Sequence, residues 1–368
     1  MGPLEGIRVI EMAGLGPGPY CGMLLADMGA DVIRIDRPGS SWGPHGETRG
    51  DVMGRGKRSI QLDLRKPEDK EIFWKLLATA DALFEGMRPG VMERLGAGPD
   101  ECLRRRPGLV YGRMTGWGQT GPMAKAAGHD INYVALTGAL AHMGTPETPM
   151  IPLNFLADFG GGGLFLAMGI LAALLKVRAG GPGQVVDAAM VDGATSMAAM
   201  FFGMSATGRW TQKRGENLLD GGAHFYNVYK TKDDHWVTVG AIEPQFYADL
   251  LKGLGISPDD PKYASYMDPS EWPSLKTDFA ARFATRTRDE WTAIFAPLDA
   301  CYAPLLTWLE APHHPHNVAR EMFVEVAGVT QPAPAPRFGA TPTSVRTAPP
   351  EIGQHTKELL QELGIPTT

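Results

Sequence analysis

The sequence predicts an α/β fold, with a large Rossmann-like domain built on a parallel sheet and a smaller α+β domain after it. Strand and helix patterns alternate over the first third of the chain, and a hairpin pattern followed by helices begins near Phe225. In addition, 43% of the 368 residues are hydrophobic, which is enough to bury a substantial core.

Five short apolar runs in the first third are the expected strands, at residues 7–12, 31–36, 59–64, 82–85 and 109–114. Helix patterns at 20–28 and 67–80 separate some of them, so we expect the strands to be parallel. Residues 160 to about 207 are rich in Met, Ala and Gly, and we expect helices there with one interruption at 179–184.

The second part of the chain starts with a hairpin pattern, in which residues 227–230 and 235–243 flank a turn at 232–234. Helices are expected to follow the hairpin. The Pro-, Ser- and Thr-rich stretch 332–350 predicts a surface linker, and a final amphipathic helix is expected at 352–363.

Composition and charge narrow the function. The net charge of −6 gives no support for nucleic-acid binding, which favours an excess of basic residues. The uncharged stretch 159–175 reaches the lower edge of membrane-spanning length, but its glycines and its neighbours Asp158 and Lys176 favour a buried core helix. The three cysteines are scattered, and we expect free thiols in a reducing compartment.

A glycine-rich turn after the first strand resembles a dinucleotide-binding fingerprint. Gly14 and Gly16 fit that pattern, but Pro19 stands where the third glycine belongs. Pro17 and Pro19 also remove two N–H donors that would bind a pyrophosphate. A tight strand-to-helix turn, with Pro19 starting the helix, is therefore the favoured interpretation.

Basic residues lie in loops at or just beyond the expected strand ends, where open α/β sheets bind their ligands. They suit phosphate groups, although a solvated surface is an equally good interpretation of each one. The six are Arg34, Arg37, Arg55, Lys57, Arg58 and Arg88.

Two segments carry candidate acid/base groups. Asp130 is a candidate N-cap, and a helix N-terminus there would stabilise an oxyanion while the adjacent His129 acts as a base. Asp158 precedes four glycines that would let a ligand approach the backbone, and its apolar neighbours would raise the pKa of its carboxyl. The alternative interpretations are a capping Asp130 beside a solvent-facing His129, and a second helix cap at Asp158.

Two segments of the second part have simpler interpretations. Glu243 comes just before Pro244, which keeps it extended, so it is either a turn residue or a group that orients a catalytic side chain. The histidine-rich segment 313–316 contains a proline and lacks acidic neighbours, so we expect a loop there and no metal site.

These segments together resemble the α-methylacyl-CoA racemases, a group within the family III CoA-transferase superfamily. The likeness runs in order along the chain, from the first strand to residues 352–356. The other motifs that carry it lie at residues 34–40, 54–59, 128–133, 156–159, 217–223 and 239–247.

The resemblance implies a large α/β domain built from both chain ends, a smaller domain and an interlocked homodimer. The expected boundaries are 1–207 and 335–368 for the large CoA-binding domain, 225–325 for the small domain, and 208–224 and 326–334 for linkers. The implied reaction interconverts (R)- and (S)-2-methylacyl-CoA thioesters by 1,1-proton transfer through an enolate. The implied partners are the acyl-CoA substrate and a second copy of the chain, with no nucleic acid or membrane. No metal or redox cofactor is implied, because CoA belongs to the substrate.

The resemblance also implies residue roles. His129 and Asp158 would be the acid/base groups on opposite faces of the α-carbon, and Glu243 would orient the histidine. The Asp130 N–H would receive the enolate oxygen. Because a thioester α-proton is weakly acidic, its removal demands such a positioned base and oxyanion site. The implied CoA contacts are Arg37, Lys57 and Arg88 at the phosphates, Gln61, Leu62, Asp63 and Leu64 beside the adenine, and Gly128, Ile131, Asn132 and Tyr133.

The sequence departs from the family pattern at two points. His224 stands where the family carries proline, which would alter the acyl pocket, and the peroxisomal tail of the animal enzymes is missing, which suggests a cytoplasmic protein. Two alternatives stay open: a family III CoA-transferase that uses Asp158 as a nucleophile, and a non-catalytic acyl-CoA-binding protein. The His129 segment opposes the first, and the intact polar positions oppose the second. The preferred acyl group stays open.

Overall fold

A computed structural model describes residues 2–39 and 48–366, so Ser40 of the motif at 34–40 lies outside the described residues. Internal contacts divide the chain into two compact units. Unit 1 comprises Met1–Thr137, Leu153–Ala198 and Pro315–Thr368, and unit 2 comprises Gly138–Pro152 and Ala199–His314.

This division differs from the expected domain boundaries in two segments. Residues 138–152 belong to unit 2, because Trp210 Nε1 donates to His142 Nδ1 over 3.2 Å and Arg214 Nη1 donates to the Ala141 carbonyl over 2.6 Å. Residues 315–334 belong to unit 1, where Arg55 Nη1 donates to Gln331 Oε1 over 2.8 Å. Each of these segments was expected to belong with its neighbours along the chain. Its hydrogen bonds instead join it to the other unit.

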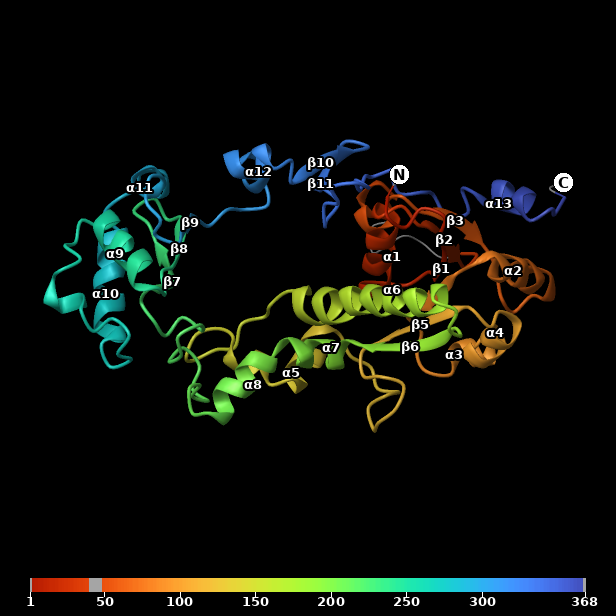
Figure 1. Cartoon of the computed structure of the whole chain (residues 1–368), viewed down its shortest axis with the longest axis horizontal. Helices are drawn as coiled ribbons and strands as arrows, with labels where there is room; N and C mark the ends of the chain where they lie inside the picture. Colours follow the sequence, from red (N-terminus) through yellow and green to blue (C-terminus); the bar gives the residue numbers. More distant parts are fainter. Residues whose placement is uncertain (1, 40–47, 367–368) are drawn as a thin grey trace. The chain divides into compact units, whose positions relative to one another are not determined.

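Unit 1 is built on a six-stranded parallel sheet in the order β3-β2-β1-β4-β5-β6 (Figure 1). The sheet order reverses between β1 and β4, and ligands bind at such a point outside the carboxyl ends of the strands. Its strands and helices, in chain order, are β1 (Arg8–Met12), α1 (Pro17–Asp27), β2 (Asp31–Asp36), β3 (Arg58–Gln61), α2 (Pro67–Thr79), β4 (Ala82–Glu85), α3 (Val91–Arg94), α4 (Pro99–Arg105), β5 (Val110–Thr115), α5 (Asp130–Leu136), the π-helix η4 (Phe155–Leu164), α6 (Phe165–Arg178), β6 (Gln184–Ala189) and α7 (Met190–Met197).

The five predicted strands of this sheet are confirmed, but the sixth was missed. Strand β6 pairs with β5 along its whole length, from Gln184 beside Val110 to Ala189 beside Thr115. The interruption expected between helices at 179–184 leads into this strand, whose six residues are followed at once by α7. Helix α1 starts at Pro17 rather than at Pro19, so the glycine-rich segment is the tight strand-to-helix turn that was favoured.

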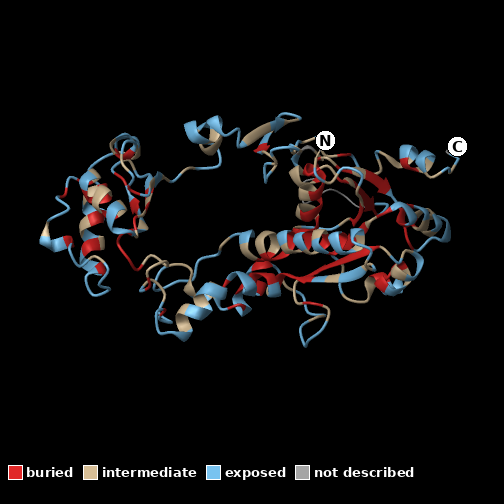
Figure 2. Cartoon of the chain, viewed as in Figure 1, coloured by how far each residue is buried: buried red, intermediate tan, exposed pale blue. Residues whose placement is uncertain are grey.

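Helix α6 packs on β5 and β6. A Cβ placed on Gly112 of β5 would lie 2.8 Å from Leu166 Cδ1, so this strand leaves room for the helix. By length and composition, Phe155–Arg178 is apolar enough to cross a membrane, and 44% of its most apolar window is buried. Figure 2 shows the division between the buried and exposed residues of the helix. The buried face supports the expected core helix, while Met168 and Leu175 are exposed on the other face.

The glycines at 160–163 serve helix packing rather than ligand approach. A Cβ on Gly161 would collide with the backbone of α7 at Ala194, and a Cβ on Gly163 would lie 2.7 Å from the Pro17 carbonyl of α1. Glycine at these positions lets η4 lie directly against α1 and α7. The run thus fixes the helix that carries Asp158.

The last part of the chain joins unit 1 through short elements: α12 (Pro315–Ala319), the antiparallel hairpin of β10 (Phe323–Val326) and β11 (Val329–Pro332), and α13 (Thr356–Glu362). Strand β11 lies where a linker at 326–334 was expected, so that expectation was wrong. The predicted final helix is confirmed as α13, and the Gly353 N–H donates to Ser59 Oγ of β3 over 2.7 Å. The histidine-rich segment forms the 3-10 helix Ala311–His313 and the start of α12 rather than a loop.

Unit 2 contains the three-stranded antiparallel sheet β7-β8-β9, which packs on helices around an aromatic core. The predicted hairpin is confirmed as β7 and β8, whereas the three-residue β9 was too short to recognise. The elements are α8 (Ala199–Ala206), β7 (Tyr226–Lys230), β8 (Trp236–Gly240), α9 (Pro244–Gly253), α10 (Trp272–Phe283), α11 (Arg288–Phe295) and β9 (Tyr302–Pro304).

Candidate acid/base site

His129 lies at the N-terminus of α5 and is exposed. It is the N-cap residue, with extended backbone, and its N–H donates to Asn132 Oδ1 over 3.0 Å. The N-cap was expected at Asp130, but it is His129, one residue earlier. Asp130 is the first residue of α5, where a backbone N–H has no acceptor within its own helix. This end of α5 therefore presents an imidazole next to an amide that can bind an oxyanion.

The Asp130 side chain links α5 to η4. Its carboxylate is 4% exposed, and Oδ2 accepts the backbone N–H groups of Ala157 over 2.9 Å and of Asp158 over 2.8 Å. These two N–H groups belong to the first turn of η4, which lacks acceptors of its own. One carboxylate thus ties the residue beside His129 to the backbone of Asp158.

Asp158 lies in η4, a π-helix of ten residues, and its side chain is half-buried. Asn154 Nδ2 donates to Asp158 Oδ2 over 2.6 Å. Burial is the main cause that raises the pKa of the Asp158 carboxyl above its usual range; the hydrogen bond from Asn154 opposes it, the charge of Asp130 adds to it, and His129 opposes it. The charge of His129 therefore acts on the Asp158 carboxyl.

The turn after β1 also reaches Asp158. Gly16 has a φ of +66°, and a Cβ there would lie 3.1 Å from Asp158 Oδ2. Gly16 also precedes the first residue of α1, so the carboxyl lies close to the positive end of that helix. Asn154 and Gly16 are contacts that the sequence analysis missed. The signal available was an amide four residues before Asp158, together with a glycine in the turn at the sheet's switch point.

An aromatic pair supports the segment that carries His129. Tyr133 donates its hydroxyl to the Gly128 carbonyl and packs edge-on against Trp117, with ring centroids 4.7 Å apart. A Cβ on Gly128 would lie 2.7 Å from Tyr133 Cε1, so only glycine fits there without a shift. Tyr133 and Gly128 therefore have packing roles that position His129.

The basic residues at the strand ends separate into exposed and buried sets. Arg37 after β2 and Arg88 after β4 are exposed at the carboxyl edge of the sheet. The side chain of Lys57 is 0% exposed, and its Nζ lies 2.6 Å from Glu11 Oε2 and donates to the Pro19 carbonyl over 3.0 Å. Its expected contact with a CoA phosphate is corrected, because its ammonium group is enclosed and paired.

The other basic residues are paired as well. Arg55 forms an ion pair with Asp27 at 2.6 Å, and Arg34 forms one with Asp36 at 3.0 Å. Arg58 is partly buried and bound to Asp31 at 2.6 Å. These three side chains stabilise unit 1, and their position near strand ends reflects packing.

The segment expected beside the adenine has one exposed residue. Gln61 ends β3 and is exposed, whereas Leu62 and Leu64 are 3% and 5% exposed and pack in the core. Asp63 accepts hydrogen bonds from Arg65, which hold the pKa of its carboxyl at about 2. Gln61 is therefore the accessible side chain of this segment, and the expected position of residues 61–64 beside the adenine stays a prediction.

Ile131 and Asn132 complete the predicted set in α5. Ile131 is 36% exposed, so its side chain is accessible at the first turn of the helix. Asn132 instead caps His129 through its amide oxygen. Of these two, Ile131 alone is accessible without breaking a hydrogen bond of the helix start.

Unit 2 carries the remaining candidates. Glu243 is exposed, extended and the N-cap of α9, in agreement with the restriction imposed by Pro244. His224 is wholly buried, and its Nε2 lies 2.8 Å from the Tyr247 hydroxyl. The aromatic rings of Phe225, Tyr247 and Phe279 surround it, so its imidazole packs in the core of unit 2, and its expected effect on the acyl pocket stays a prediction.

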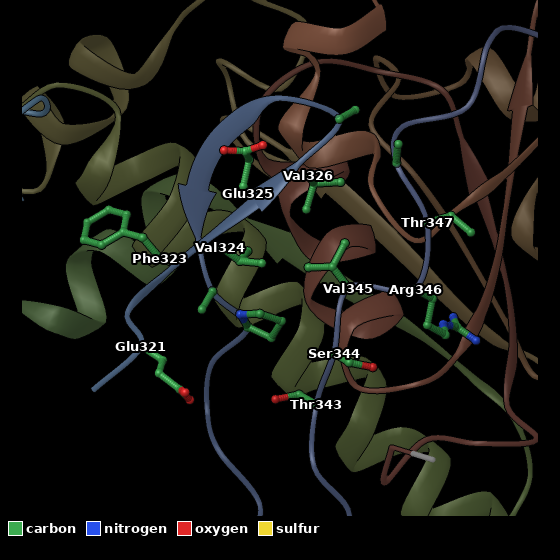
Figure 3. A pocket seen from close by; sticks show the side chains of 14 residues that line it. Glu321, Phe323, Val324, Glu325, Val326, Thr343, Ser344, Val345, Arg346 and Thr347 are labelled. Carbon is green, nitrogen blue, oxygen red and sulfur yellow. The ribbon is translucent and has the colours of Figure 1, made fainter. Parts of the chain in front are cut away.

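A cavity of about 780 Å³ lies between the β10–β11 hairpin and residues 343–348 (Figure 3). Its lining residues fall between Glu321 and Ala348, and none is a predicted site residue. The cavity is therefore distinct from the acid/base site at α5 and η4.

Comparisons with known proteins identify the family of this chain. The profile of CoA-transferase family III matches residues 4–356. The chain is 47% identical to "Alpha-methylacyl-CoA racemase" of Mus musculus and 46% identical to that of Homo sapiens, over 98% of this chain and 93% of each relative. A crystal structure of a CaiB/BaiF family protein from Brucella suis has a TM-score of 0.84 and 27% identity, and the match covers 98% of this chain and 99% of that one. The chain therefore belongs to CoA-transferase family III.

Proposed function

We propose that this protein interconverts (R)- and (S)-2-methylacyl-CoA thioesters by moving the α-proton, as the names of its mammalian relatives indicate. The observation that carries the proposal is the link through Asp130, which joins the residue beside His129 to the backbone of Asp158. Two groups that exchange a proton with one carbon need such a fixed relation.

The chemistry follows from the two environments. In one direction His129 removes the α-proton, the electrons move to the thioester oxygen, and the Asp130 N–H stabilises the enolate. Asp158 then donates its proton to the opposite face of the α-carbon. Half-burial and the nearby Asp130 favour the protonated Asp158 that this direction needs. In the reverse direction the two groups exchange roles.

Exposed basic residues support binding of the CoA part. Arg37 and Arg88 suit the phosphates, with Gln61 beside them on the next strand end. These three residues take no part in proton transfer. Their contribution is to hold the thioester over the acid/base pair.

We also propose that two copies of the chain form the active dimer. In unit 1, one face of the segment from η4 to α6 exposes Leu164, Met168 and Leu175 by 49%, 59% and 72%. Their spacing of four and seven residues places them in one stripe of a helix, and exposed apolar patches of this kind mark protein interfaces. In this dimer Glu243 of one copy orients His129 of the other.

Deuterium incorporation tests the reaction. In D2O, either enantiomer of a 2-methylacyl-CoA should acquire α-deuterium with no carboxylate acceptor present. A family III transferase would instead require the acceptor and leave the α-position unlabelled. Transfer of CoA to an added carboxylate, with the α-position unlabelled, would overturn the proposal.

Coexpression tests the shared site. His129→Ala and Glu243→Ala chains should each be nearly inactive alone, but a heterodimer gathers both changes into one site and leaves the other native. Random pairing would restore about a quarter of the wild-type activity by the symmetry of the dimer. If activity stays at the level of the separate variants despite confirmed heterodimers, Glu243 acts within its own subunit.

A further inference from the structure

The carboxylate of Asp130 makes hydrogen bonds outside its own helix. Both N–H groups that it accepts belong to η4, and the residue that it holds most closely is Asp158 itself, at 2.8 Å. A buried carboxylate bonded to two backbone N–H groups at a helix start is a strong, charge-assisted arrangement. Its geometry therefore fixes where the Asp158 backbone lies relative to α5.

The other oxygen of this carboxylate is equally informative. Asp130 Oδ1 is buried and has no hydrogen-bond partner among the described residues. No ion pair between Asp130 and a basic side chain occurs in that part of the chain either. Among the described residues, the hydrogen-bond partners of this buried carboxylate are therefore the two backbone N–H groups of η4.

The carboxylate of Asp130 acts on the carboxyl of Asp158. The groups that face its carboxyl are Asn154 of the segment before η4, Gly16 at the start of α1, and His129, Asp130 and Tyr133 of α5. Among these groups, Asp130 is the one whose charge raises the pKa of the Asp158 carboxyl. It thus favours the neutral, proton-bearing form of Asp158.

We propose that the Asp130 side chain is the positioning residue of the acid/base pair: its carboxylate fixes the Asp158 backbone relative to His129. The proposal rests on the racemase function above. It assigns to Asp130 a side-chain role separate from the oxyanion contact of its backbone N–H. Because both roles reside in one residue, the oxyanion donor and the acid are held in one rigid frame.

The informative variant is Asp130→Asn, which keeps an oxygen that can accept the two N–H groups but removes the charge. Its turnover should fall about tenfold or more, while KM changes less than threefold, because a neutral amide oxygen holds the two N–H groups less firmly than a carboxylate and loosened catalytic groups affect turnover before binding. The titration of the Asp158 carboxyl, followed by ¹³C NMR of labelled aspartate and assigned with Asp158→Asn, should move to lower pH. The rate profile should show the same shift.

Asp27→Asn is the matched control, because Asp27 is an equally buried aspartate of unit 1 that is paired with Arg55 and does not act on the Asp158 pKa. It should lower the melting temperature without moving the Asp158 titration. If Asp130→Asn fails to fold, Asp130→Ser removes the charge with a smaller side chain, and the same titration is measured. If Asp130→Arg proves soluble, the shift should be larger.

The outcomes separate this proposal from the racemase function. An Asp158 titration that is unchanged in a folded Asp130 variant, with normal turnover, overturns the positioning role. Absence of α-deuterium incorporation by the wild-type protein contradicts the racemase function instead, and the NMR titration still reports on Asp130 in that case. A shifted titration together with reduced turnover supports both.

Discussion

Two regions of unit 1 use charged side chains differently. The ion-pair region comprises Glu11, Asp27, Arg34, Asp36, Arg55 and Lys57. Its basic side chains are no more than 3% exposed, and each is bonded to a carboxylate. The α5–η4 region comprises His129, Asp130, Asn154 and Asp158, of which His129 is exposed and Asp158 half-buried.

The difference separates charged side chains that stabilise the fold from those that can exchange protons with a substrate. Burial raises the pKa of Glu11 and of Asp158 alike, but Lys57 opposes the shift at Glu11, whereas a neutral amide does so at Asp158. A carboxyl paired to a buried cation has no access to a substrate. A half-buried carboxyl with a raised pKa and a neighbouring imidazole can exchange protons. Accessibility, rather than residue type, therefore distinguishes the two regions.

The largest expected effect lies in the α5–η4 region. His129→Ala or Asp158→Asn should lower turnover by about two to four orders of magnitude, the usual contribution of a positioned acid or base. The melting temperature should change little, because both side chains contact solvent. Steady-state kinetics and thermal unfolding on the same samples measure this. Near-normal turnover in either variant would remove that residue from the mechanism.

In the ion-pair region, a substitution should instead lower the stability of the protein more than it affects catalysis. Lys57→Met leaves the Glu11 carboxylate buried without its cation and should lower the unfolding free energy by about 3–5 kcal/mol. The double variant Glu11→Leu/Lys57→Met should recover most of that loss, since apolar replacement of a buried pair is close to neutral. Denaturant unfolding measures both. A raised KM with unchanged stability would mean that Lys57 contacts CoA after all.

Arg88 should behave as a binding residue with no part in the core. Removing an exposed group that makes a charge-assisted hydrogen bond costs about 1.5–3 kcal/mol, so Arg88→Ala should raise KM by roughly 10- to 100-fold. Turnover and stability should stay close to wild type. Comparison of acyl-CoA with the corresponding acyl-pantetheine thioester, which lacks the CoA phosphates, supplies the control. If the variant loses equal activity on both, Arg88 acts on the acyl or thioester part.

Sequence patterns predicted the parallel sheet well, because alternating strands and helices leave a clear period. They missed β6, whose six residues are followed at once by α7, and the β10–β11 hairpin, whose second strand runs into the proline-rich stretch 332–350. The switch-point turn and the segments carrying His129 and Asp158 were also identified. Their roles came from the likeness to known enzymes, since each segment alone fits a helix cap equally well.

The contacts between those segments could not be predicted from sequence patterns. Lys57 and Arg88 both follow or precede strands in polar loops, yet one is enclosed by Glu11 and Pro19 and the other is exposed. Likewise, Asp130 was predicted as a helix cap through its local position. Its actual partners are 27 and 28 residues away, a separation that no periodicity reports.

His224 extends the same contrast to unit 2, where it is the buried counterpart of the exposed His129. Burial, with a smaller contribution from the charge of Lys276, lowers the pKa of His224 to about 3 from an ordinary value of 6.5. The folded form therefore binds fewer protons than the unfolded form over this interval. The stability that the neutral His224 contributes is fully present above about pH 6.5 and is lost as the pH falls toward 3.

The smallest expected effect follows from this linkage. Between pH 6.5 and 5.5, wild-type protein should lose about 1 kcal/mol of unfolding free energy through His224 alone. His224→Gln should abolish that component, since glutamine can still bond to the Tyr247 hydroxyl but does not titrate. Tyr247→Phe is the control, because it removes the hydrogen bond while leaving the buried imidazole. Denaturant titrations at each pH give the slopes, and equal slopes for wild type and His224→Gln would show that the imidazole is solvated enough to protonate in the folded protein.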